Sequence, residues 1–224
     1  MSGPDAALIA ERLAAVEDRI AAVGGTGVEV LAVTKSHPAT LVAAAIEAGC
    51  GRFGESYAQE LVAKDAELRG TPLASTGAAT APRWCFIGQL QTNKVRLVAP
   101  IVEMVCSVDR PRLVEELARR APGLTVMIEV DLATQVGRGG CTLDAVPGLV
   151  ELAAQRGLRP VGLMGVAPIG DTATVRTAFR ALRGAVDSLG LEQCSMGMTA
   201  DLEIAVEEGS TMVRVGTALF GPRR

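Results

Sequence analysis

The sequence is poor in histidine and in paired cysteines, two features on which many functional sites depend. It holds one histidine, His37, and five scattered cysteines without any C-x-x-C pair. A single histidine argues against a Ser-His-acid triad, and the absence of clustered ligands argues against a zinc site. An odd number of scattered cysteines also argues against a disulfide framework. We therefore expect buried, reduced thiols and no metal centre.

Surplus positive charge and long apolar runs are also lacking. The chain has 22 Lys and Arg against 25 Asp and Glu, a net charge of -3 and a pI near 5.4, so no basic surplus exists to neutralise nucleic-acid phosphates. Its longest apolar stretches are about ten residues long, short of the roughly 20 that a membrane span needs. Charges interrupt the first 20 residues, unlike the apolar region of a signal peptide. The sequence predicts a soluble cytoplasmic protein without nucleic-acid or membrane partners.

Aromatic residues form only 3% of the chain, whereas Ala, Val, Leu and Gly abound. This composition favours small side chains packed between helices and buried strands. Apolar runs of strand length occur at 28–34, 52–54, 84–87, 104–108, 124–130, 160–166, 193–198 and 212–215. Helical spacing of apolar residues fills the intervals, at 40–48, 58–68, 93–98, 110–120, 143–156, 172–189 and 201–208. Eight predicted strands thus alternate with seven predicted helices.

Eight alternating units predict a closed barrel. The strands begin about every 26 residues, enough for a strand, a helix and two short loops. An open doubly wound sheet would need a Gly-rich first turn, which is missing. We expect a single-domain (β/α)8 TIM barrel over residues 1–224, with a flanking N-terminal helix within 1–25. Its apolar stripe is predicted as Leu8, Leu13, Val16 and Ile20.

One lysine lies where a barrel would place its chemistry, at the carboxyl end of a strand. Lys35 ends the run VEVLAVTK and precedes Ser36-His37-Pro38. Near an apolar wall the pKa of a lysine falls, and its neutral amine can then attack a carbonyl to form a Schiff base. A solvated lysine at a loop edge is the alternative. Lys64 and Lys94 are the other candidates, but both fall in helical segments.

The last two strands predict a phosphate cradle. The hydroxyls of Ser195 and Thr199, with backbone N–H groups at the start of the next helix, can bind a phosphate after the seventh strand. Gly216 and Thr217 supply close backbone approach and another hydroxyl after the eighth. Plain turns are the alternative.

Arg214 lies within the eighth strand, on the pleat opposite to Val213 and Val215, so it should point into the barrel or its mouth. An unpaired buried arginine is unfavourable, so the side chain needs a partner. That partner is either a structural carboxylate such as Glu129 or a ring nitrogen of a ligand.

Six motifs carry a resemblance to a known family, nearly from end to end of the chain. They are LAVTKSHP, GCGRFGESYAQEL, WCFIGQLQTNK, CSVDR, GLMG and SMGMTADLEIAVEEGSTMVRVGTALFG. The chain closely resembles the pyridoxal 5'-phosphate (PLP) homeostasis proteins, relatives of the barrel domain of alanine racemase. The resemblance implies that Lys35 holds PLP as a Schiff base and that Arg214 faces the pyridine nitrogen. It also implies a phosphate site formed by Ser195, Gly197, Thr199, Gly216 and Thr217, with Ser56 near the ring.

This family is credited with no robust catalysis, and the resemblance implies a role in vitamin B6 and amino-acid homeostasis, with PLP-dependent apo-enzymes as candidate recipients. A permanently charged arginine keeps the ring nitrogen unprotonated, which weakens the cofactor as an electron sink. Alanine racemases also use a base from an additional β domain, for which 224 residues leave no room. We therefore expect a monomeric binding protein without a catalytic residue. The only tyrosine, Tyr57, is expected to serve in packing.

Several positions depart from the family pattern. Ser56 stands where asparagine is usual, Cys85 and Gln89 where histidine is usual, and Thr199 where serine is usual. Arg138 replaces a lysine of some relatives, and 70–82 predicts a surface loop. Two other functions remain open. One is a PLP-dependent amino-acid racemase or lyase of the same barrel type, and the other is a phosphometabolite barrel that uses Lys35 as a Schiff-base catalyst.

Overall fold

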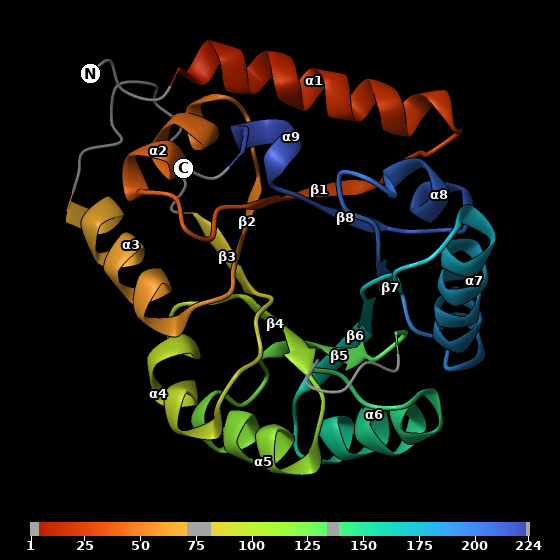
Figure 1. The fold of residues 1–224 in the computed structure, drawn as a ribbon. Helices are drawn as coiled ribbons and strands as arrows, with labels where there is room; N and C mark the ends of the chain where they lie inside the picture. The colour runs from red at the N-terminus through yellow and green to blue at the C-terminus, as the bar shows by residue number, and fades with distance from the viewer. Residues whose placement is uncertain (1–4, 71–81, 134–138, 223–224) are drawn as a thin grey trace.

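Eight parallel strands close into a barrel in the order of the chain, and β8 pairs with β1 to complete it (Figure 1). The fold comes from a computed structural model that describes residues 5–70, 82–133 and 139–222. The strands are β1 (Glu29–Val33), β2 (Arg52–Glu55), β3 (Arg83–Phe86), β4 (Met104–Val108), β5 (Thr125–Val130), β6 (Arg159–Gly165), β7 (Gln193–Ser195) and β8 (Met212–Val215). The predicted (β/α)8 barrel is confirmed.

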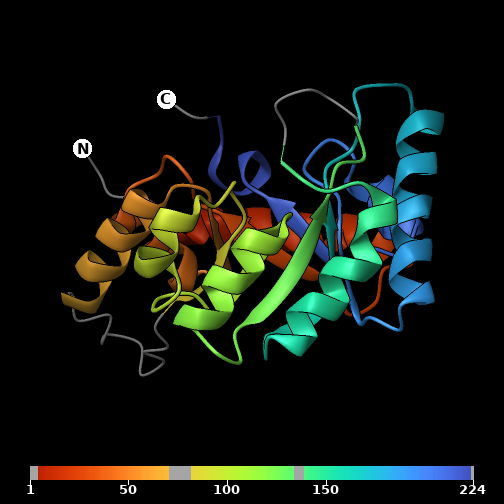
Figure 2. The same cartoon turned by 90° about the horizontal axis from the view of Figure 1, so that it is seen from below.

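Helices cover the outside of the barrel (Figure 2); most connect consecutive strands, whereas α1 precedes β1 and α9 follows β8. They are α1 (Ala6–Ala22), α2 (Ala39–Glu47), α3 (Ala58–Gly70), η1 (Thr92–Lys94), α4 (Val95–Val98), α5 (Pro111–Arg120), η2 (Leu143–Ala145), α6 (Val146–Gln155), α7 (Thr172–Ser188), α8 (Leu202–Glu207) and α9 (Thr217–Phe220). The sequence did not predict α9, because four residues are too few for an apolar period. Within the described ranges, no helix has the length and apolar character needed to cross a membrane.

The flanking helix α1 packs on the barrel through a stripe that differs from the predicted one at its first member. Ile9, Leu13, Val16 and Ile20 are buried, whereas Leu8 is 41% exposed. The prediction of Leu8 was wrong because it lies five positions before Leu13, while steps of three and four keep side chains on one helical face. Asp5 caps the helix by accepting the N–H groups of Ala7 and Leu8. Each buried stripe residue contributes about 1.5–3 kcal/mol.

The core has two layers, because successive side chains of each strand point to opposite sides of the barrel wall. Outward side chains such as Phe53 and Trp84 pack against the helices in the larger layer. The inner layer is filled by Leu31, Cys85, Met104, Cys106, Met127, Val161, Met164 and Met212. All five cysteines are buried and free, as predicted. This packed interior leaves the carboxyl ends of the strands as the place for a ligand.

Two sequence predictions concern segments outside the described residues. The loop predicted at 70–82 falls almost entirely on residues 71–81, and Arg138 falls within 134–138.

Candidate functional site

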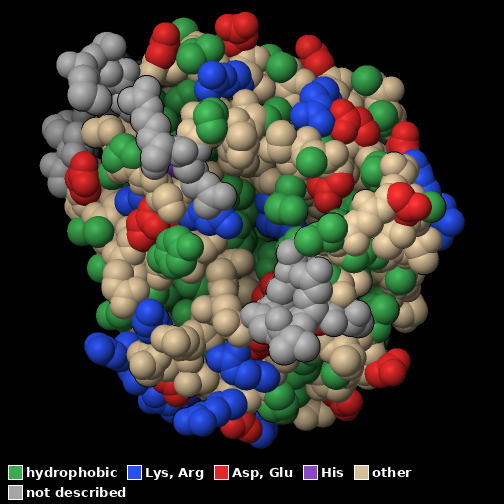
Figure 3. All heavy atoms as spheres, viewed as in Figure 1, with side chains coloured by type: hydrophobic (Ala, Val, Ile, Leu, Met, Phe, Trp, Pro, Cys, Tyr) green, Lys and Arg blue, Asp and Glu red, His purple; other side chains and the backbone are tan. Residues whose placement is uncertain are grey.

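A cavity of about 320 Å³ opens at the carboxyl ends of the strands. It lies within the range of roughly 300–1,000 Å³ that small-ligand sites occupy. Figure 3 looks onto this face of the barrel and shows it hollowed near the middle. Six of the eight site residues predicted from the sequence line the cavity: Lys35, Ser56, Thr199, Arg214, Gly216 and Thr217. The structure therefore brings together residues at or just beyond the carboxyl ends of β1, β2, β7 and β8 that lie up to 182 positions apart, as counted from Lys35 to Thr217.

The alternation of side chains along β1 places Lys35 at this cavity. In β1, Leu31 lies inside the barrel and Val33 lines the cavity, while Thr34 is buried on the other side of the wall. Lys35 continues the inward series just beyond the strand and is half-buried. The next residue, Ser36, has φ 64°, the only left-handed value of a non-glycine residue in the described chain. A sharp turn therefore follows the lysine immediately.

Arg214 is buried below the cavity, with 5% of its surface exposed. Its Nη1 donates to the carbonyl oxygen and to Oγ of Ser195, both at 2.8 Å, and its Nη2 donates to the carbonyl oxygen of Gly165 at 2.8 Å. Burial lowers the pKa of the guanidinium from its usual value, and the nearby Cys106 and Glu129 oppose this shift. The structure thus gives Arg214 hydrogen bonds to carbonyls and a hydroxyl, not to the carboxylate of Glu129 that the sequence had suggested.

The two predicted phosphate loops meet side by side at the cavity. After β7, Gly197 has φ 94°, and a Cβ there would lie 2.5 Å from the Cβ of Ala205. After β8, a Cβ on Gly216 would lie 3.2 Å from the carbonyl oxygen of Val33. Gly197 therefore requires the absence of a side chain, whereas a Cβ at Gly216 would only be tightly packed. Ser195 and Gly197 sit just behind the cavity wall, and Ser195 is held by Arg214.

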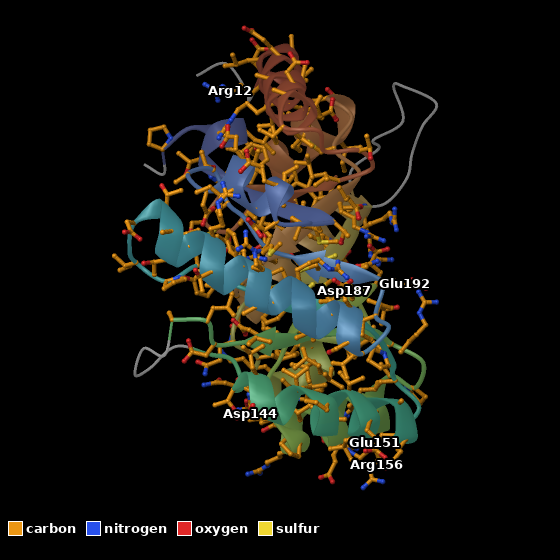
Figure 4. The ribbon with its side chains drawn as sticks, turned by 90° about the vertical axis from the view of Figure 1, so that its right-hand side faces the viewer. Arg12, Asp144, Glu151, Arg156, Asp187 and Glu192 are labelled. Carbon is orange, nitrogen blue, oxygen red and sulfur yellow. The ribbon has the colours of Figure 1, made fainter. Side chains whose placement is uncertain are left out.

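Two arginines of α1 brace these loops from outside the barrel. Arg19 donates to the carbonyl oxygen of Thr199 at 3.0 Å and pairs with Glu203 at 2.6 Å. Arg12 donates to the carbonyl oxygen of Leu219 in α9 at 3.1 Å (Figure 4). Sequence reasoning missed both residues. Their spacing of seven on one helical face was the available signal, because positions i and i+7 share a face.

Glu129 is an ionisable group of the cavity that the sequence considered only as a partner for Arg214. It lies at the carboxyl end of β5 and lines the cavity opposite β1 and β8. Burial raises the pKa of its carboxyl to about 7, the negative charges of Asp109 and Asp131 also raise it, and Arg214 lowers it. A carboxyl that titrates near neutrality can hold or release a proton at the cavity wall.

We expect Glu129→Gln to change how stability depends on pH. From the ordinary carboxyl pKa of 4.5 up to about 7, the folded protein keeps a proton that the unfolded chain releases. Because the folded state then binds more protons, the free energy of unfolding of the unmodified protein falls as pH rises through this window. The shift corresponds to about 3 kcal/mol at most.

The measurement is urea unfolding of both proteins, without added ligand, between pH 4.5 and 8. We expect the Glu129→Gln variant to gain stability relative to the unmodified protein as pH rises, with the gain levelling off about one pH unit above the raised pKa. Stability curves that run parallel across this range would refute the assignment of a raised pKa to Glu129.

The remaining predicted positions lie away from the cavity. Lys64 is a buried residue of α3, and Lys94 is half-buried with its Nζ 3.4 Å from Oε1 of Gln59. Cys85 lies in the inner barrel layer, and Gln89 is exposed. Tyr57 is 55% exposed, so the packing role predicted for it was wrong. Its position at the start of α3 directs the side chain outward rather than into the core.

A larger hollow, of about 740 Å³, lies on the rim between the β5 loop and α7. Its lining is formed mainly by Ala, Thr, Leu and Pro side chains, together with Asp131 and Asp171. Among the described residues that line it, none is a lysine, arginine or histidine. A phosphate-bearing ligand therefore fits the smaller cavity, which is lined by Lys35 and Arg214.

Fold and cavity define a (β/α)8 barrel of the alanine racemase type, and residues 5–224 match the family "Alanine racemase, N-terminal domain". A pyridoxal phosphate homeostasis protein of Pseudomonas aeruginosa is 40% identical over 229 residues, which cover 96% of each chain. The Escherichia coli K12 protein of the same name is 37% identical and covers 96% of this chain and 97% of its own. This chain belongs to the family of pyridoxal phosphate homeostasis proteins.

A solved structure of this family agrees with the assignment. PipY of Synechococcus elongatus PCC7942, described as having PLP bound, superposes with a TM-score of 0.79 at 33% identity. The superposition covers 95% of this chain and all of the PipY chain.

Proposed function

We propose that this protein binds PLP in the cavity at the carboxyl ends of the strands, with Lys35 as the covalent attachment point. It then takes part in intracellular vitamin B6 and amino-acid homeostasis. One observation carries the proposal: a single cavity is lined by Lys35, by Arg214 and by the two loops that contain Thr199 and Thr217. The PLP-bound PipY structure supports it from a related chain.

The residues of the cavity fit this cofactor in each of its parts. A lysine amine can form a Schiff base with the aldehyde of PLP, and a buried guanidinium can donate a hydrogen bond to its ring nitrogen. The loops at Thr199 and Thr217 match a phosphate, because they offer hydroxyls and backbone N–H groups with glycines close by. When bound, PLP supplies an aldehyde that amines attack reversibly and a ring that withdraws electrons.

Each residue then has a distinct task. Lys35 holds the cofactor, and Thr199 and Thr217 orient its phosphate from two neighbouring loops. Arg214 stays charged and fixed by Ser195 and Gly165, so it faces the ring as a donor that gives up no proton. Ser56 borders the same space from β2 and leaves room beside the ring because its side chain is short.

This arrangement favours holding the cofactor over turning over amino acids. A charged arginine at the ring nitrogen disfavours the build-up of negative charge on the ring. The only tyrosine of the chain, Tyr57, is exposed and does not line the cavity, so it supplies no base there.

One observation favours a second candidate function, an amino-acid racemase or lyase. Glu129 lines the cavity with a pKa of about 7, which suits a general acid or base. Incubation of PLP-loaded protein with L- and D-amino acids, followed by chiral chromatography, separates the two functions. Turnover that disappears in Glu129→Gln would favour the enzyme, and unchanged amino acids favour the binding protein.

The same proposal extends to the setting in which the protein works. Residues 1–224 act as one PLP-binding domain, with 1–25 as its flanking helix, and the protein is a cytoplasmic monomer. Its recipients are PLP-dependent apo-enzymes.

The first test is the visible absorption spectrum of the purified protein with added PLP, before and after treatment with borohydride. We expect a yellow protein whose colour is fixed by reduction, with the added mass on the peptide that contains Lys35. A protein that stays colourless and takes up no PLP would overturn the proposal and favour the phosphometabolite barrel. In that case borohydride treatment in the presence of PLP would add no mass to the protein, because such a barrel would form a Schiff base only with its own carbonyl substrate.

A further inference from the structure

Behind Lys35, on the outer side of the barrel wall, lies a cluster of three charged side chains that the proposed function does not use. We call Glu55, Glu60 and Lys64 the α3 clamp, because Glu60 and Lys64 belong to α3 and Glu55 ends the strand before it. Glu55 is fully buried and Lys64 is 4% exposed. Buried charges of this kind are rare unless they are paired.

Lys64 uses its three donors within this cluster. Its Nζ donates to Oε1 of Glu55 at 2.6 Å, to Oε1 of Glu60 at 2.7 Å and to the carbonyl oxygen of Thr34 at 2.7 Å. An ammonium has three N–H groups, so this lysine is fully satisfied. One of its three partners is the residue directly before Lys35.

The two carboxylates hold the chain on either side of Lys35. Oε1 of Glu55 accepts a hydrogen bond from the hydroxyl of Thr34 at 2.7 Å. Oε1 of Glu60 accepts a hydrogen bond from the backbone N–H of Ser36 at 2.5 Å. The α3 clamp thus grips the residues before and after Lys35, while Lys35 itself faces the cavity.

The grip on Ser36 coincides with backbone strain. Its φ of 64° is the only left-handed value of a non-glycine residue in the described chain. Side chains with a Cβ disfavour this region, so a serine there must be held by its surroundings. The bond from its N–H to Glu60 is such a restraint.

The α3 clamp is also a poor device for stability alone. It places two carboxylates around one ammonium, and Oε2 of Glu55 is buried without a hydrogen-bond partner. Apolar side chains of similar volume often stabilise a protein at least as well as a buried ion pair. A buried oxygen without a hydrogen-bond partner lowers stability, so its presence needs an explanation other than stability.

We propose that Glu60 and Lys64 are positioning residues that fix the direction of Lys35 by holding the strained turn at Ser36. The proposal rests on the proposed function, in which Lys35 attaches the cofactor. With the α3 clamp loosened, Ser36 relaxes out of its left-handed conformation and the amine of Lys35 leaves its aligned position. Covalent attachment then becomes slower, although the cavity and its phosphate loops stay intact.

The test compares Glu60→Gln, Ser36→Gly and the double variant by the rate at which visible absorbance develops after PLP is added. We expect Glu60→Gln to slow attachment about tenfold, a modest part of what loss of alignment produces in enzymes. Glycine adopts the left-handed conformation without strain. Ser36→Gly should therefore restore most of the rate in the double variant. If Glu60→Gln slows attachment equally with and without Ser36→Gly, the proposal is overturned.

Asp65→Asn is the matched control, because Asp65 is a buried carboxylate next to Lys64 on α3 that binds Nε1 of Trp84 instead of the Lys35 turn. We expect it to lower the unfolding temperature without slowing attachment. If slowing instead follows the loss of unfolding temperature across all variants, the role is structural and the proposal fails. Lys64→Met and Lys64→Arg form a second pair of variants. We expect PLP attachment to be faster in Lys64→Arg, which keeps the positive charge, than in Lys64→Met.

A second readout needs no cofactor. Brief acetylation with acetic anhydride, mapped by mass spectrometry, reports the reactivity of each lysine in the protein as purified and stripped of PLP. We expect Glu60→Gln to change the acetylation rate of Lys35 and leave that of Lys94 unchanged. A protein that shows this change but never attaches PLP would support the α3 clamp and refute the proposed function. Attachment of PLP with neither rate altered would refute the α3 clamp alone.

Discussion

Lys35→Ala protein is expected to take up no borohydride-fixed label from PLP, whereas the unmodified protein is labelled at Lys35. The structure places this lysine just beyond β1, where it borders the cavity with Thr199 and Thr217. Alanine keeps the strand and the cavity but removes the amine, so nothing remains there to bond an aldehyde. The fold should be preserved, because Lys35 is half-buried at the mouth and outside the core.

Lys94→Ala is the matched control for this experiment. Lys94 lies in η1, outside the residues that line the cavity, and its Nζ interacts with Gln59. We expect it to keep both the yellow colour and the label on Lys35. Visible absorption that is unchanged in Lys35→Ala, or a label that moves to Lys64 or Lys94, would refute the role of Lys35. Peptide mapping after reduction distinguishes these cases.

Arg214→Ala is expected to combine a large loss of stability with an altered spectrum. The substitution leaves the carbonyl oxygens of Ser195 and Gly165 buried without their donors. Each buried group that loses its hydrogen bond costs about 1–3 kcal/mol, so the free energy of unfolding should fall by about 2–6 kcal/mol. Urea unfolding at pH 7 measures this loss directly.

The same variant tests whether Arg214 faces the ring of the cofactor. We expect Lys35 to remain labelled by PLP in Arg214→Ala, with a shifted absorption maximum, because the guanidinium changes the charge around the ring. Arg119→Ala is the control, since Arg119 forms an exposed ion pair with Glu116 and should change neither stability nor spectrum appreciably. An absorption maximum identical to that of the unmodified protein would place Arg214 away from the ring. If Arg214→Ala fails to fold, Arg214→Gln removes the charge while keeping an amide donor, and provides the same spectroscopic comparison.

The pattern of apolar residues was sufficient to predict the barrel because local periodicity reports which face of an element is buried. Every predicted strand and helix exists, and the main differences are at element ends. The predicted strand 193–198 stops at Ser195, since Gly197 adopts a left-handed conformation and its carbonyl oxygen binds the N–H of Arg214. The predicted helices at 93–98 and 143–156 each begin with a short 3-10 turn.

Part of the site was also predictable from the sequence. Lys35, Arg214 and the residues after the last two strands were identified because strand ends in a barrel meet on one face. Alternation within β1 and β8 then indicated which side chains point inward. Ser56 was placed by resemblance alone, and the structure puts it at the cavity.

By itself, the sequence determined the barrel, the face that bears the cavity and the lysine at its mouth, since each depends on order and period along the chain. Only the tertiary structure decided the partners of those residues. Arg19 meets Thr199, and Lys64 meets Thr34, across distances in sequence that no local pattern encodes. The pKa of Glu129 likewise depends on burial beside Asp109 and Arg214, which exists only once β4, β5 and β8 close into one barrel. The pKa and the hydrogen-bond partners of a side chain depend on the residues around it, and only folding brings those residues together.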